Sequence, residues 1–293
     1  MLETITEGSV LHGFRTEALY LDDSDAPLGA RFVHVRTGFV FDYLRLQSVP
    51  QCYLWVTTYP TSDKGEPHTQ EHLLLGKGNK GRSVASLEDM SLVSTTAYTE
   101  QWRTVYQFHT GAGPDVFFKV FEAKLDALLH PDYTDEEIRR EVRHFGAVEA
   151  PDGSLRIEEK GTVYNEMISS FERPFTRLFR ALGADVYGRN HPLAYVSGGS
   201  PAAIREMTPE DIRRFHREHY FLGNMGMIGS FPKEVALDGV LARTAAVFDR
   251  LEPEGTRAPT RVVTPKDMPA PAPAPAGNVR IVDYPGTNPQ PPG

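Results

Sequence analysis

The chain has 293 residues, of which 40% are hydrophobic, and this length allows one large domain or two ordinary ones. Its formal net charge of -8 argues against a nucleic-acid partner, because such binding depends largely on Lys and Arg side chains that neutralise phosphates. Cys52 is the only cysteine, which excludes an intrachain disulfide and a cysteine-based zinc cage. A metal site in this chain would therefore use histidine and carboxylate ligands.

Targeting and membrane signals are not visible in the sequence. The first residues lack a basic segment followed by an apolar run, and no stretch approaches the ~18 consecutive apolar residues of a membrane span. We therefore expect a cytoplasmic protein with no membrane partner.

Strand patterns dominate residues 30–60, where apolar residues alternate with polar ones and a short apolar run covers 52–56. A helix is predicted to follow. Pro67 suits its first position, and the glycines at 76 and 78 end it near residue 75.

Four aromatic residues between 95 and 108 occupy even positions, which predicts one strand with a single aromatic face. They are Tyr98, Trp102, Tyr106 and Phe108. Core packing is favoured over a substrate-facing wall, because aromatic stripes are usually core. Apolar residues at helical spacing predict a further helix over 114–129.

The composition changes after residue 254, since 265–277 reads PKDMPAPAPAPAG, an extended Ala/Pro segment that cannot pack a core. We predict a domain over 1–258 and a linker over 259–277. Residues 278–293 would then be a disordered tail or the start of a further, missing domain, opening with a strand at 278–284.

The segment 67–72 reads PHTQEH and contains H-x-x-E-H on the predicted helix. His68 and His72 lie one turn apart on one face, a spacing at which two imidazoles bind one Zn2+. Glu71 lies beside them, where its carboxylate can accept a proton from water acidified by the metal. This order of residues is the inverted-zincin signature.

A catalytic zinc needs a third protein ligand, and Glu166 in 161–167 (GTVYNEM) is the best candidate. Glu159 lies seven residues earlier, so on one helix the two would share a face, and Glu159 could orient a ligand histidine. Glu149 and Glu158 compete with Glu166 on charge alone. We expect the three ligand atoms to lie within ~3 to 4 Å of one another.

Three segments in order resemble the pitrilysin/insulinase family of metallopeptidases, and most closely its presequence-protease subgroup. They are 61–72 (TSDKGEPHTQEH), 161–167 and 191–220. The resemblance covers roughly residues 10 to 255. It implies an α+β fold of the mitochondrial-processing-peptidase type, in which a mixed β-sheet and the helices on one face form two layers.

The resemblance also implies a function, a zinc-dependent endopeptidase that hydrolyses unfolded peptides. His68, His72 and Glu166 would be the ligands of one Zn2+ per chain, and Glu71 the general base. Glu159 matches the second acidic residue that the family places before the ligand glutamate. The paired glycines at 198–199 are expected to form a structural turn.

Two departures from the family pattern stand out. Thr96 occupies a position where the family usually has Asn, on the strand that holds substrate. The family proteases of this subgroup are also much longer, so a second peptidase half or a homo-oligomer is an expected partner. The alternative function is a non-catalytic subunit or scaffold of the same fold, which needs or serves a partner half.

A glycine-rich segment at 76–81 matches G-x-G-x-x-G. We do not expect nucleotide binding there, because a phosphate-binding loop follows a strand, whereas this segment follows a predicted helix. Arg82 also stands where a P-loop has Lys.

Overall fold

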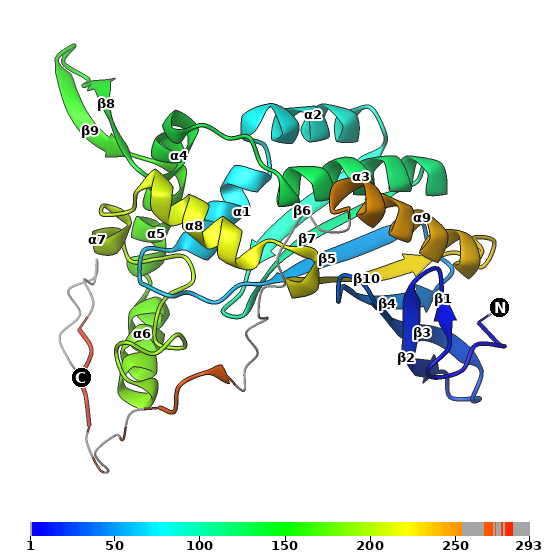
Figure 1. Cartoon of the computed structure of the whole chain (residues 1–293). Coiled ribbons are helices and arrows are strands. Elements are labelled where there is room, and N and C mark those ends of the chain that lie inside the picture. Colours follow the sequence, from blue (N-terminus) through cyan, green and yellow to red (C-terminus); the bar gives the residue numbers. More distant parts are fainter. Residues whose placement is uncertain (1, 254–266, 272, 274–276, 278, 284–293) are drawn as a thin grey trace. The chain divides into compact units, whose positions relative to one another are not determined.

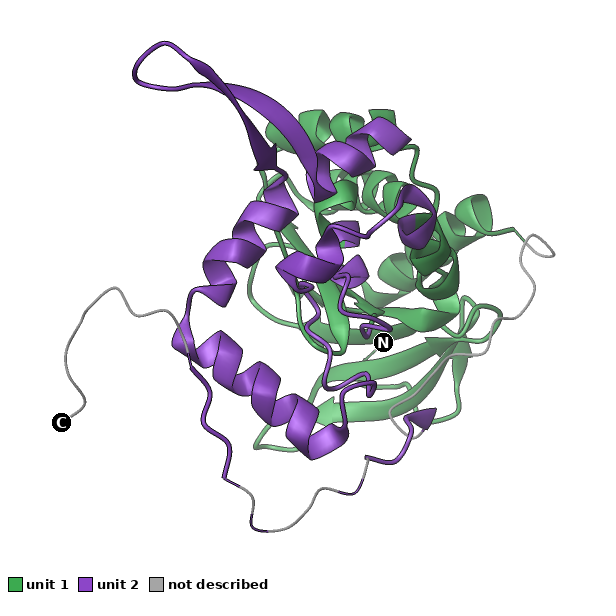
Figure 2. Ribbon diagram, turned by 90° about the vertical axis from the view of Figure 1, so that its left-hand side faces the viewer, with its two compact units in different colours: residues 1–58, 71–134, 213–262 green, residues 59–70, 135–212, 263–293 purple. Residues whose placement is uncertain are grey.

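A computed structural model describes residues 2–253, 267–271, 273, 277 and 279–283 (Figure 1). The chain divides into two compact units (Figure 2). Unit 1 is Met1–Thr58, Glu71–Thr134 and Arg213–Val262, and unit 2 is Tyr59–Gln70, Asp135–Ile212 and Val263–Gly293. The predicted domain boundary at 258 lies outside the described residues. No helix in the described part is long and apolar enough to cross a membrane.

Unit 1 is built on an eight-stranded mixed sheet with the order β1-β2-β3-β4-β10-β5-β7-β6. Most neighbours are antiparallel, but β10, which comes late in the chain, is inserted between β4 and β5 and runs parallel to β4. The strands are β1 (Val10–Leu11), β2 (Phe14–Leu21), β3 (Pro27–His34), β4 (Val40–Arg45), β5 (Gln51–Thr57), β6 (Val93–Thr99), β7 (Arg103–Thr110) and β10 (Met225–Phe231).

Helices of unit 1 pack over one face of this sheet, as Figure 1 shows for α2 (Gly78–Asp89), α3 (Pro114–Leu129) and α9 (Leu237–Leu251). The predicted helix over 114–129 is confirmed, with the apolar positions of α3 buried. The predicted two-layer α+β architecture is likewise confirmed. Helix α2 was not predicted, because its first residues belong to the glycine-rich segment.

An aromatic cluster fills the space between the sheet and these helices. The ring centroid of Phe117 lies 5.0 Å from those of Phe108 and Phe231 and 6.2 Å from that of Phe121. All four side chains are buried. Burial of this much aromatic surface is a main source of stability for the layer contact.

The aromatic stripe between 95 and 108 is not one strand, which corrects the prediction. β6 and β7 form a hairpin, with Thr99 opposite Thr104. The even spacing continues across the turn, so it mimics a single strand. Tyr106 and Phe108 are in the core, whereas Tyr98 and Trp102 are 40% and 36% exposed.

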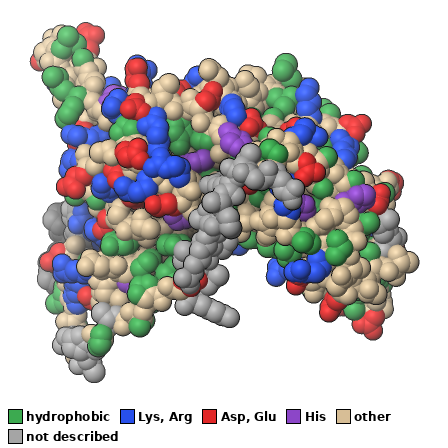
Figure 3. All heavy atoms as spheres, in the orientation of Figure 1, with side chains coloured by type: hydrophobic (Ala, Val, Ile, Leu, Met, Phe, Trp, Pro, Cys, Tyr) green, Lys and Arg blue, Asp and Glu red, His purple; other side chains and the backbone are tan. Residues whose placement is uncertain are grey.

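Unit 2 is mainly helical and carries a two-stranded hairpin, β8 (His144–Glu149) and β9 (Leu155–Lys160). Figure 3 shows hydrophobic atoms on the projecting end of this hairpin, where Leu155 and Ile157 are exposed. The helices are α4 (Asp135–Val142), α5 (Thr162–Phe171), α6 (Pro174–Tyr187) and α7 (Pro201–Ile204). The unit boundaries fall inside α1 (Glu66–Leu74) and α8 (Pro209–His219).

The strand predicted for 278–284 is absent from its described part, because residues 279–283 adopt no regular structure. A strand requires a neighbour to satisfy its backbone groups, and none pairs with 279–283 among the described residues. The segment runs beside a helix instead, as its ion pair from Arg280 to Asp185 of α6 indicates.

Phe117→Ala tests the aromatic cluster. We expect it to lower the free energy of unfolding by ~3 to 5 kcal/mol, because it leaves a cavity among three aromatic rings. Denaturant unfolding measures this loss. Met90→Ala is the control, since that side chain is 79% exposed, and we expect a change within ~0.5 kcal/mol. Equal losses in both variants would contradict the assigned core.

Candidate metal centre

The helix that carries the H-x-x-E-H motif begins where the sequence predicts. α1 spans Glu66–Leu74, with Pro67 in its first turn. Ser62 donates from Oγ to Glu66 Oε1 at 2.7 Å, and the Thr69 amide donates to the Gly65 carbonyl at 3.0 Å. These bonds fix the direction in which the helix leaves the preceding loop.

Close backbone contacts support the first turn of α1. Gly65 has a φ of +81°, and a Cβ built there would lie 2.4 Å from the carbonyl oxygen of Gly198. A Cβ on Gly198 would in turn lie 2.5 Å from Met167 Sδ and 3.5 Å from His68 Nδ1. The glycines at 198–199 thus form the expected structural turn, and they also let the chain pass directly beside a candidate ligand.

The predicted ligands His68, His72 and Glu166 lie close together. One ligand atom from each falls within 4.8 Å of the other two, and His68 Nε2 is 3.6 Å from Glu166 Oε1. The set is somewhat wider than the predicted 3 to 4 Å. In the part of the chain that the structure describes, no other group of three such residues meets this criterion.

α5 presents Glu166 toward α1 because its other face is anchored. Val163, Tyr164 and Met167 are buried, and Gly161, just before the helix, packs so closely that a Cβ would lie 2.3 Å from the carbonyl oxygen of Val142. Glu166 is 54% exposed on the remaining face. An exposed side chain can adjust its rotamer, so it can draw closer to a cation.

Glu71 is 6% exposed and accepts a hydrogen bond that the sequence did not indicate. Thr99 Oγ1 donates to Glu71 Oε2 at 2.5 Å. The Thr99 hydroxyl is also 3.2 Å from that of Thr104, which lies 2.9 Å from that of Thr58. The Thr99 hydroxyl, which ends β6, therefore holds one oxygen of the predicted general base and is itself linked to hydroxyls on β7 and just after β5. No local pattern around Thr99 could reveal this contact.

Glu159 lies in β9 rather than on the helix of Glu166, so the two do not share a helical face, contrary to the prediction. Its carboxylate accepts hydrogen bonds from Arg205, at 2.7 and 2.9 Å, and from Arg143 and Tyr164. Among the described residues, its partners do not include either histidine of α1. The Arg205 bonds, followed by those from Tyr164 and Arg143, lower the pKa of Glu159 to about 2.

The competing glutamates do not enter the cluster. Glu158 forms an ion pair with Arg156 at 2.5 Å, and Glu149 is an exposed residue at the end of β8. Two imidazoles and one carboxylate are a donor set that Zn2+ accepts. Tetrahedral bonds of ~2.1 Å imply ligand atoms ~3.4 Å apart, so a metal would have to draw this set together only slightly. The residues therefore fit a zinc ion.

Glu159→Gln tests the arginine network. The pKa of Glu159 in the folded chain, about 2, lies below its ordinary value of 4.5, so the ionised carboxylate stabilises the fold above pH ~4.5 and loses this effect as the pH falls toward 2. We expect the variant to be less stable by ~1 to 2 kcal/mol at pH 7, with a difference that shrinks toward pH ~3.

Urea unfolding across this pH range is the measurement, and Glu172→Gln is the control because that residue is exposed and follows α5. A pH-independent difference between Glu159→Gln and the parent would rule out the ionised carboxylate as its cause.

Comparison with known proteins finds relatives along most of the chain, although no family model matches it. An uncharacterised protein of Saccharomyces cerevisiae is 32% identical over 224 residues, which cover 71% of this chain and 20% of that protein. The mitochondrial presequence protease of Danio rerio is 28% identical over 72% of this chain and 21% of its own length. The chain thus spans about a fifth of the length of these curated relatives.

Among solved structures, pitrilysin matches with a TM-score of 0.60 at 18% identity, over 86% of this chain and 26% of that chain. At this identity the match concerns the fold. The expected resemblance is confirmed at that level, since the sheet and its helices follow the same arrangement. The chain therefore has a pitrilysin/insulinase-like fold.

Proposed function

We propose that this chain is the catalytic module of a zinc-dependent endopeptidase that hydrolyses peptide bonds in unfolded peptides. The observation that carries the proposal is the approach to within 4.8 Å of ligand atoms from His68 and His72, on the helix that also bears Glu71, and from Glu166 on α5. A scaffold protein has no need to keep two histidines and a distant glutamate together beside a buried carboxylate. The presequence protease among its relatives supports the same class of reaction.

In this proposal His68, His72 and Glu166 hold one Zn2+ per chain. When bound, Zn2+ polarises the scissile carbonyl and lowers the pKa of water at the site. With three protein ligands, a bound zinc ion would be able to accept a water or substrate oxygen as well.

Glu71 acts as the general base and then as the general acid. Its carboxylate accepts a proton from the attacking water and later gives that proton to the leaving amine, so that the C–N bond breaks to a neutral product. The hydrogen bond from Thr99 to Oε2 positions the carboxylate. Thr99 is therefore a positioning residue for the base.

The substrate strand is proposed to lie along β6, the last strand in the order of the sheet. Edge strands present backbone N–H and C=O groups to which an extended peptide can hydrogen-bond. Such binding depends on the peptide's backbone rather than on its side chains. Thr99, which contacts Glu71, ends β6, so a peptide paired along this strand would pass the base. Thr96, the departure from the family pattern, lies in the middle of β6 and would influence peptide register.

Glu71→Gln separates metal binding from chemistry. We expect the variant to retain about one zinc per chain while its turnover falls by several orders of magnitude, because the base is lost and the ligands remain. Zinc analysis together with cleavage of a quenched-fluorescent peptide measures both. His72→Ala is the matched comparison, and we expect it to lose zinc as well as turnover. Near-normal turnover of Glu71→Gln would remove Glu71 from its proposed role.

The chain corresponds to about a fifth of its curated relatives, so we propose that a second half or a second copy completes the enzyme. Without a second half or a second copy, the bound peptide would be exposed to water on one side. Loss of one oxyanion donor alone typically lowers the rate by ~10²- to 10³-fold.

We therefore expect residues 1–293 alone to fold, bind zinc and cleave peptides poorly. Turnover is measured on the isolated chain over a range of protein concentrations, and again with the remaining part of a presequence-protease-like chain added in trans. A steep rise with concentration would identify a homo-oligomer, and a rise on addition would identify a second half. Full, chelator-sensitive activity of the dilute isolated chain would show that no partner is needed.

A further inference from the structure

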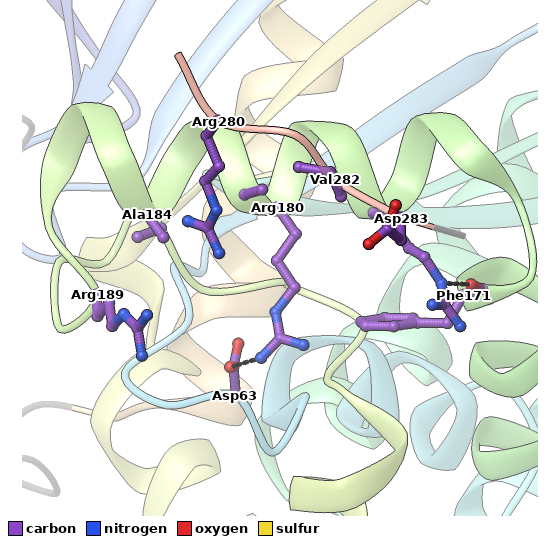
Figure 4. A pocket seen from close by; sticks show the side chains of 11 residues that line it. Asp63, Phe171, Arg180, Ala184, Arg189, Arg280, Val282 and Asp283 are labelled. Atoms are coloured by element: carbon purple, nitrogen blue, oxygen red, sulfur yellow. Dashed lines mark hydrogen bonds and ion pairs between the residues drawn. The ribbon is translucent and has the colours of Figure 1, made fainter. Parts of the chain in front are cut away.

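Unit 2 contains a hollow of about 660 Å³ that plays no part in the proposed reaction. Its walls come from α6, from Asp63 in the loop before α1, and from residues 280–283 (Figure 4). The volume lies within the ~300 to 1,000 Å³ of small-ligand sites, which is room for a short piece of extended peptide.

The face of α6 that lines the hollow is cationic and open. Arg177, Arg180, Ala181 and Ala184 follow the i, i+3, i+4, i+7 spacing that places residues on one side of a helix. Ala181 and Ala184 have short side chains, so they leave space beside the guanidinium groups of Arg177 and Arg180. Figure 4 shows this face of the helix toward the hollow, with Arg180 extending to Asp63.

Two of the four arginines in the lining are neutralised. Arg180 donates to Asp63 Oδ2 at 2.6 Å, and Arg280 donates to Asp185 Oδ1 at 2.7 Å. These pairs fix the arginine side chains, and each guanidinium still has N–H groups free to bind another acceptor, because the group carries five donors.

The other two arginines have no carboxylate partner among the described residues. Arg177 donates from Nε to the Phe171 carbonyl at 2.6 Å, which leaves its charge uncompensated, and Arg189 is exposed at the rim. Asp283 contributes one unpaired carboxylate to the lining. The four arginines exceed the two aspartates of the lining, in a chain whose formal net charge is -8. The hollow is therefore a cationic site on an acidic protein.

The wall at Asp63 is built into the loop that leads to α1. Asp63 Oδ1 accepts from the Val196 amide at 3.1 Å, and the Asp63 carbonyl accepts from the Ser200 amide at 2.8 Å. Asp63 lies five positions before His68, so the hollow and the candidate ligand share one short, hydrogen-bonded segment. The loop that carries Asp63 therefore links one wall of the hollow to the first turn of α1.

We propose that this hollow binds the carboxylates of an acidic segment of the peptide substrate, with Arg177 and Arg189 as the specificity-determining residues. Guanidinium groups bind carboxylates in a planar, two-pronged geometry, and the alanines and Phe171 accommodate the aliphatic stems of glutamate side chains. The site would favour peptides that carry acidic residues on one side of the scissile bond. This inference rests on the proposed peptidase function for its substrate, although binding can be measured without cleavage.

The test uses the full chain with Glu71→Gln and a fluorescein-labelled, unstructured peptide that contains a run of glutamates. Binding of the peptide is measured by fluorescence anisotropy at constant ionic strength. The same peptide with glutamines in place of the glutamates is the ligand control. We expect the acidic peptide to bind more tightly, and Arg177→Gln combined with Arg189→Gln to weaken it about tenfold.

Arg173→Gln is the matched protein control, since Arg173 is an exposed arginine just before α6 and does not line the hollow. We expect it to change binding by less than about twofold. Equal weakening by Arg173→Gln would overturn the proposal in favour of long-range attraction. Inorganic phosphate that displaces the peptide at equal concentration would also overturn it, because the site would then be one for small anions.

The outcomes separate this inference from the proposed function. Equal binding of the acidic and glutamine peptides, with zinc-dependent cleavage intact in the parent chain, would remove only the specificity site. Selective, arginine-dependent binding in a chain that never cleaves peptides would keep the site and remove the peptidase.

Discussion

The candidate metal centre depends on backbone contact at the start of α1. Gly65 and Gly198 approach so closely that a Cβ on either would collide with the other segment or with Met167. This contact sets where the first turn of the helix lies relative to the segment at 198–199 and to α5. His68, in that first turn, consequently lies with its Nε2 atom 3.6 Å from Glu166 Oε1. Glycine is required because side chains would force the segments apart.

Local chemistry explains which features could be predicted from the sequence. Helix α3 has a regular apolar period, and α1 has a proline start and a glycine stop, so both were predictable. The position of β10 between β4 and β5 was not, because pairing between strands that lie far apart in the sequence, as Gly226 and Val40 do, leaves no local signal. The turn between β6 and β7 was not predicted, because the aromatic residues on both sides of it occupy even positions, as they would on one continuous strand.

In the candidate site, too, residues that lie close in the sequence were predicted to lie together, whereas contacts between distant segments leave no local signal. His68, Glu71 and His72 share one helical segment, so their spacing alone predicted that they lie together. Glu166 was the best candidate from the residues, with Glu149 and Glu158 as competitors, and the resemblance supported it. Its approach to His68 depends on how α5 packs. The role of Thr99 beside Glu71 could not be predicted, because that bond joins a helix to a strand end. Glu159 was expected on the helix of Glu166, but the chain enters a hairpin strand there instead.

The surroundings of two glutamates show how one chain assigns them different tasks. Glu159 accepts from two arginines and a tyrosine, which hold its pKa at about 2, so at neutral pH it stays ionised and takes up no proton. Its task is to join Arg143 of the hairpin base to Arg205 after α7. Glu71, on the helix of His68 and His72, is buried and accepts a hydrogen bond from the Thr99 hydroxyl, which orients its carboxylate. A general base must lie within hydrogen-bond reach of the proton that it abstracts, so the proposed role of Glu71 depends on this orientation of its carboxylate.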